Sequence, residues 1–183
     1  MSIVKPDITY VPLDPINAKN MERILVDHFN PRVNIIVPNV GYGLQLHDCD
    51  LLILTKSNYA IEIEIKISAA DLRIDKHKRH GHVDRKNRIK TLYFAVPPAL
   101  KELALTECPE RAGIIVVYGE RHRKYYEGVD PHIEIVRKPT VNKSIPFTDS
   151  ERNHLLHLGI QRYWSCKSKL LLYKYRIDKE KTK

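Results

Sequence analysis

The chain has 183 residues, which is enough for one buried core, so we expect a single domain. Lys and Arg number 31 against 22 Asp and Glu, and the net charge of +9 favours a polyanionic partner such as nucleic acid. The three cysteines are too widely spaced for a disulfide framework or a CxxC metal site. The sequence pattern predicts neither a secretory leader nor a membrane span, and we expect a soluble, cytoplasmic protein.

The positive charge is concentrated in two blocks. Residues 66–90 contain nine basic and three acidic residues, and residues 161–183 contain eight basic and two acidic residues, so each block has a net charge of +6. Such blocks are typical of nucleic-acid-binding surfaces, but solvated faces that keep a protein in solution explain them equally well.

Apolar periodicity and turn residues predict an α/β fold with a mixed central sheet flanked by helices. The order from residue 16 to 96 is helix, three strands, helix, strand. The predicted elements are an extended arm at 1–15, helices at 16–29, 69–80, 99–107 and from about 149 to 172, strands at 32–38, 50–55, 60–67, 91–97 and 112–119, a strand at the end of 120–136, and a basic tail at 176–183.

The strand at 60–67 reads AIEIEIKI and alternates between apolar and charged residues. Residues two apart share a face of a strand, so Glu62, Glu64 and Lys66 project together. The turn at 56–58 makes a hairpin that brings Asp50 near Glu64. Two carboxylates about 4 Å apart repel by roughly 4 kcal/mol at an effective dielectric near 20, which a hard divalent cation such as Mg²⁺ or Mn²⁺ would relieve. The alternation alone also fits a strand whose charged face is simply solvated.

Asp50 followed by Glu64-Ile65-Lys66 resembles the PD-(D/E)XK nuclease motif, and the order of elements resembles the restriction-endonuclease-like αβββαβ core. The segments YAIEIEIKISAADLRIDKHKRHGH, LYFAVPPAL and AGIIVVYG are similar to the MmcB-like DNA-repair proteins. The resemblance implies metal-dependent hydrolysis of DNA phosphodiester bonds, with Mg²⁺ or Mn²⁺ as the cofactor. Asp50, Glu64 and the Ile65 main-chain carbonyl would then be metal ligands, and Lys66 would be the catalytic lysine.

The sequence departs from the full motif in one place and leaves two ligands open. Cys49 precedes Asp50 where the family often has a proline. Glu62 has three interpretations: a second metal ligand, a residue that hydrogen-bonds to the ligands without contacting the metal, or an ordinary exposed residue. Glu22, in the first predicted helix, is the candidate for the glutamate that some family members contribute from that helix.

The helix after the charged strand is predicted to bind the DNA backbone. Its spacing places basic residues along one stripe, where they could contact phosphates beside the metal. Asp71 and Asp75 interrupt this stripe, so a helix face paired by internal salt bridges is the competing interpretation. The predicted nucleic-acid-binding residues are Arg73, Lys76, His77, Arg79 and His80.

Three functions remain open from the sequence. The first is a DNA nuclease in repair or processing, and the second is a nucleic-acid-binding module on the same fold with little or no catalysis. The third is an interaction protein whose charged strand is only a solvated face. The preference for single-stranded or duplex DNA and the formation of a homodimer are not determined.

Overall fold

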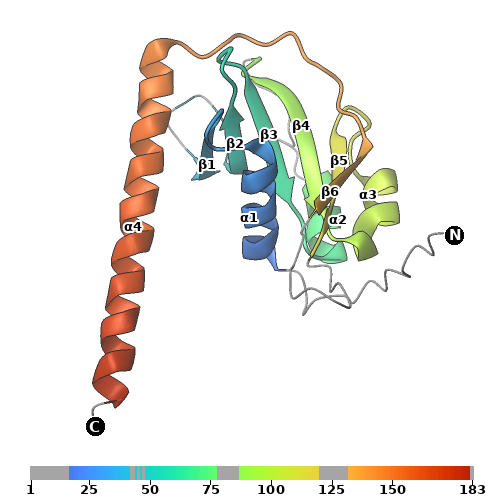
Figure 1. Cartoon of the computed structure of the whole chain (residues 1–183). Helices are drawn as coiled ribbons and strands as arrows, with labels where there is room; N and C mark the ends of the chain where they lie inside the picture. The colour runs from blue at the N-terminus through green and yellow to red at the C-terminus, as the bar shows by residue number, and fades with distance from the viewer. Residues whose placement is uncertain are drawn as a thin grey trace, which may run out of the picture.

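The computed structural model describes residues 17–41, 44, 46, 48–77, 87–119 and 132–181, so the predicted arm at 1–15 lies outside the described residues. Six strands form one mixed sheet, as the sequence predicts, and they lie in it in sequence order (Figure 1). The first three strands are antiparallel, β3, β4 and β5 are parallel, and β6 is antiparallel to β5. The strands are β1 (Ile35–Val40), β2 (Cys49–Leu54), β3 (Ala60–Ile65), β4 (Ile89–Val96), β5 (Gly113–Tyr118) and β6 (His132–Arg137).

One face of the sheet is covered by α1 (Ala18–Phe29). Asn17 caps this helix by accepting a hydrogen bond from the Asn20 N–H at 3.0 Å. Met21, Ile24 and Leu25 form an apolar stripe on this helix and are buried against residues of β2, β3, β4 and β5. This face of the sheet is therefore a continuous apolar core.

The other face is covered by α2 (Ala69–His77), the turn η1 (Pro98–Leu100) with α3 (Lys101–Glu107), and the first turns of α4 (Asp149–Lys181). Leu72 of α2 packs with Leu92 and Phe94 of β4. Leu155 of α4 packs with residues of β1 and β2. Helices therefore lie on both faces, as an α/β fold requires.

The longest helix, α4, begins at a capping box formed by Thr148 and Glu151. The Thr148 N–H donates to Glu151 Oε2 at 2.8 Å, and the Glu151 N–H donates to Thr148 Oγ1 at 3.3 Å. The predicted end of this helix at Leu172 is wrong, because the helix continues to Lys181 and so includes most of the basic tail at 176–183. The sequence offers no Gly or Pro after Leu172 to stop it, and its Lys, Arg and Glu residues favour helix. Within the ranges that the structure describes, no helix is both long and apolar enough to cross a membrane.

Gly113 allows β5 to pass close to a ring on β4. A Cβ atom at this position would lie 2.5 Å from Tyr93 Cδ1, which is far inside van der Waals contact. We expect Gly113→Ala to lower the free energy of unfolding by about 1–3 kcal/mol through overpacking. The measurement is urea unfolding followed by circular dichroism. In a double-mutant cycle with Tyr93→Val, most of the cost should disappear, and additive costs would contradict this origin.

Candidate active site

The pairing of β2 with β3 brings the predicted site residues together. Leu52 pairs with Glu62 and Leu51 pairs with Ile63, so continuing the antiparallel register places Asp50 opposite Glu64. Asp50 lies at the start of β2 and Glu64 lies near the end of β3. The hairpin therefore produces the juxtaposition that the sequence predicts.

A hydrogen bond fixes the carboxylate of Asp50 at the end of β3. Asp50 Oδ2 accepts the Ile65 N–H at 2.8 Å. Only one oxygen of Asp50 takes part in this bond, and the residue is only half-buried. Oδ2 therefore holds the Asp50 carboxylate beside Ile65. Ile65 is also the residue whose main-chain carbonyl is predicted to be a metal ligand.

Glu64 and Lys66 form a buried ion pair. Lys66 Nζ donates to Glu64 Oε2 at 2.8 Å, and the two side chains are only 9% and 6% exposed, respectively. The second oxygen, Glu64 Oε1, is also buried, and no described residue gives it a hydrogen bond. A buried carboxylate oxygen without a donor is costly, so this atom has the property expected of a ligand for a cation.

The environment of Glu64 raises the pKa of its carboxyl group above the ordinary value of 4.5. Burial is the largest cause, and the negative charges of Asp50 and Glu62 act in the same direction. Lys66 opposes them through its charge and its hydrogen bond. The pair is therefore only partly compensated, and an additional positive charge at this place would stabilise the ionised form.

The solvated-face interpretation of the charged strand is wrong. Glu62 is 1% exposed, Glu64 4% and Lys66 7%. Their neighbours explain the burial, since Glu62 pairs with Leu92 and Glu64 pairs with Phe94, both of which pack against α2. Three charged side chains withdrawn from water on and directly after one strand are rare in a merely structural face.

Cys49 is a buried neighbour of the carboxylates that sequence reasoning noted only as the replacement of a proline. Its pKa is raised strongly by burial, and then by the charges of Glu62, Glu64 and Asp50. Cys49 is therefore a neutral thiol that packs in the core next to the site. Its position directly before Asp50 in the sequence is the signal that places it there.

Glu22 approaches the site from α1. It is half-buried, and its pKa is raised first by burial and then by the charge of Asp50. The helix thus supplies a further carboxylate in the electrostatic field of Asp50, at the residue that the sequence marks as a candidate. The signal is its place directly after Met21, on the border of the buried stripe of the helix.

The donors at this place fit a hard divalent cation. Asp50 and Glu64 provide carboxylate oxygens on adjacent strands, one of them buried without a hydrogen-bond donor among the described residues. Within the described ranges, no group of three or more His, Cys, Asp or Glu side chains is arranged to hold a metal ion. Glu22 and Glu62 therefore do not join the other two in one ligand set here. Mg²⁺ suits such a sparse site, because it keeps several waters and needs only one or two carboxylates.

The predicted DNA-binding helix is described only in part. The backbone of α2 is helical from Ala69 to His77, and Arg73 is exposed on it. The side chains of Lys76 and His77 and the whole of Arg79 and His80 lie outside the described residues. The phosphate-binding stripe therefore stays a prediction, for which the exposure of Arg73 is the one structural observation.

The raised pKa of Glu64 predicts a pH-dependent contribution to stability. The folded protein holds the Glu64 proton more tightly than the unfolded chain, so this contribution is complete below about pH 4.5 and is lost as the pH rises through the folded-state pKa. In EDTA, we expect the free energy of unfolding of the wild type to fall relative to Glu64→Gln as the pH rises. Urea unfolding between about pH 4 and about pH 7 measures it. The exposed matched variant Glu110→Gln should follow the wild type, and a constant offset for Glu64→Gln would contradict the prediction.

Comparison with known proteins supports the fold and gives no information about the activity. No family model matches the chain, and no curated protein matches it. Among solved structures, the chain is similar to the SPO1766 protein of unknown function from Silicibacter pomeroyi, with a TM-score of 0.56 and 19% sequence identity. The match covers 87% of this chain and 93% of that chain. At this identity the similarity shows a shared fold alone, over nearly the whole length of both chains.

Proposed function

We propose that this protein is a metal-dependent nuclease of the PD-(D/E)XK type, similar to the MmcB-like proteins, that hydrolyses DNA phosphodiester bonds in repair or processing. The observation that carries the proposal is the buried Glu64 carboxylate, held by Lys66 on one oxygen and without a described donor on the other, opposite Asp50. The site lies where the parallel strand β3 ends, and the carboxyl ends of strands are where open α/β sheets bind ligands.

Each residue has a distinct role in this proposal. Asp50, Glu64 and the Ile65 carbonyl would hold Mg²⁺ or Mn²⁺, which when bound polarises a phosphodiester and lowers the pKa of a bound water. Lys66 neutralises charge that develops on the phosphate. Its ammonium lies 2.8 Å from Glu64 and is therefore already inside the site.

The net charge of the chain supports a polyanionic substrate. The charge of +9 favours approach of DNA, and the basic block at 66–90 directly follows Glu64 in the sequence. Arg73, exposed on α2, is the described residue of that block best placed to contact a phosphate.

A binding module without catalysis is the second candidate function. The observation in its favour is the ion pair itself, because Lys66 already gives Glu64 a positive partner. A protein that uses this pair only for stability would bind DNA through its basic surface and have no need of a divalent ion. The two candidates therefore differ in metal dependence.

The nuclease proposal predicts ion-dependent cleavage. We expect the purified protein to cut single-stranded, duplex or branched DNA in Mg²⁺ or Mn²⁺ and to be inactive in EDTA. Asp50→Asn, Glu64→Gln and Lys66→Met should each lower the rate by at least about a hundredfold, the scale of a lost charge-stabilising group. Gel analysis of labelled oligonucleotides measures the rate.

Asp48→Asn is the matched control for Asp50→Asn. Asp48 is exposed and lies two residues away, outside the buried cluster. It should leave cleavage unchanged, and circular dichroism should show that all variants are folded. Equal cleavage by the wild type and Lys66→Met would reveal a contaminating nuclease, and ion-independent DNA binding without cleavage would favour the binding module.

The same site predicts stabilisation by the ion in the absence of DNA. A ligand that binds only the folded state stabilises it by RT ln(1 + [L]/Kd), about 2.7 kcal/mol at a hundredfold excess over Kd. We expect Mn²⁺ or Mg²⁺ to raise the Tm of the wild type and of Asp48→Asn. The ion should have no such effect on Asp50→Asn or Glu64→Gln. An equal shift in all four proteins would place the ion elsewhere.

A further inference from the structure

The helix α4 has two parts with different surroundings (Figure 1). Its first turns pack on the sheet, where Leu155 is fully buried and the Cβ position of Gly159 lies 3.4 Å from Val37 Cγ2. Arg162 Nη2 donates to the Asn39 carbonyl at 2.9 Å. Beyond this residue the helix runs past the end of the sheet as a projecting rod, and residues 163–176 are exposed.

An apolar seam begins beside the face that packs on the sheet, shares Gly159 with it, and continues along the projecting part. The residues of this seam are separated alternately by three and four positions, which is the a/d pattern of a coiled coil over three heptads. They are Leu156, Gly159, Tyr163, Cys166, Leu170, Tyr173 and Ile177. The seam therefore begins in contact with the body and extends beyond it.

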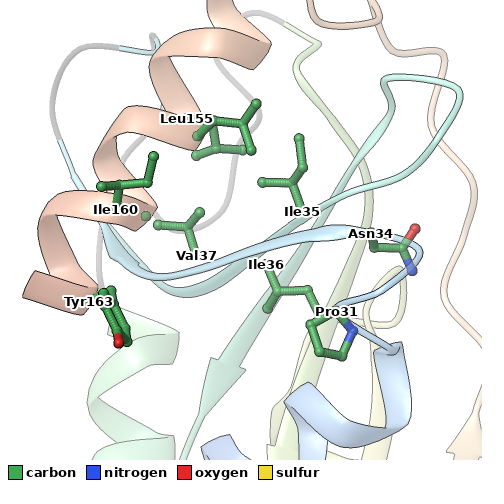
Figure 2. A pocket seen from close by; sticks show the side chains of 10 residues that line it. Pro31, Asn34, Ile35, Ile36, Val37, Leu155, Ile160 and Tyr163 are labelled. Carbon is green, nitrogen blue, oxygen red and sulfur yellow. The ribbon is translucent and has the colours of Figure 1, made fainter.

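The beginning of the seam opens on an apolar pocket between α4 and β1 (Figure 2). The pocket has a volume of about 330 Å³ and is lined by Leu156, Gly159 and Tyr163 of the helix. Ile36 of β1 and Pro31 line it from the body. A second helix bound along the seam could therefore also place an apolar side chain in this pocket at one end.

Basic residues flank the seam on both sides. Between 162 and 176, every position of the e and g type is Lys or Arg, and none is acidic. The g positions are Arg162, Lys169 and Arg176, and the e positions are Lys167 and Lys174. Charges at e and g determine the partner of a coiled coil, because each faces a residue of the opposite helix.

We propose that the seam of α4 binds an amphipathic helix of another protein that carries acidic residues at its own e and g positions. Such a helix covers the seam with apolar side chains and pairs its carboxylates with the two basic rows. A second copy of this chain would set like charges against each other in either orientation, which is destabilising. A nucleic acid would pair with the basic rows but would leave the heptad spacing of the seam without a role.

The apolar residues outside the seam provide a built-in control. Leu171 is the neighbour of Leu170 and belongs to a different face of the helix, yet the two are 59% and 56% exposed. Trp164 lies next to Tyr163, and Lys167 Nζ is 4.9 Å from the Trp164 ring centroid and 5.6 Å from that of Tyr163. Leu170 and Leu171 are therefore almost equally exposed, but only Leu170 belongs to the seam.

The test uses the full chain and a designed three-heptad peptide with Leu at a and d and Glu at e and g. We expect the peptide to bind the wild type in titration calorimetry, and to bind more weakly at high salt. Leu170→Lys should weaken binding at least tenfold, and Leu171→Lys should change it less than about twofold. Circular dichroism should show equal helix content in both variants.

A charge exchange tests the flanking rows. The double variant Lys169→Glu and Lys174→Glu should no longer bind the acidic peptide. It should instead bind a peptide with the same sequence but with Lys at e and g. Absence of peptide binding, or equal binding by Leu170→Lys and Leu171→Lys, overturns the proposal. A dimer in sedimentation that is lost in Leu170→Lys identifies a second copy as the occupant and overturns it as well. Binding of a DNA oligonucleotide that depends on the basic rows but not on Leu170, without peptide binding, assigns the rows to nucleic acid instead.

Discussion

The buried ion pair between Glu64 and Lys66 is the interaction on which the rest of the site depends. A lysine beside a carboxylate in a dry environment lowers the cost of burying either charge, but it leaves the second oxygen of Glu64 without a described donor. Asp50 adds a further negative charge from the neighbouring strand. Lys66 therefore compensates the negative charge of Asp50 and Glu64 only in part, which is the electrostatic basis of the divalent-cation site that we propose.

The sheet topology determines where this charge lies. Because β2 runs antiparallel to β3, its first residues lie beside the last residues of β3, and the parallel strands β4 and β5 end at the same edge. The half-buried Glu22 adds its charge from α1, and α2 covers the face from which Glu62 and Glu64 project. The carboxylates therefore gather at one edge of the sheet, where Asp50 is half-buried and Glu64 is buried.

The projecting part of α4 is a surface distinct from the carboxylate site. It makes no use of the carboxylates, and its seam and basic rows are arranged along a helix rather than around a cavity. In the two proposals made above, the sheet edge cleaves DNA and the projecting part of α4 binds a partner protein. The two surfaces can therefore be tested independently, and failure of one proposal leaves the other intact.

The sequence by itself determined the local features, because each depends on neighbours in the chain. These are the alternation at 60–67, the hairpin that joins Asp50 to Glu64, and the helices expected at 16–29 and from about 149. Tertiary structure alone decided that the charged face of β3 is buried, since a period of two does not say which face a later helix will cover. It also decided that Glu22 lies in the field of Asp50, and that α4 leaves the sheet, because these depend on packing between segments far apart in the chain.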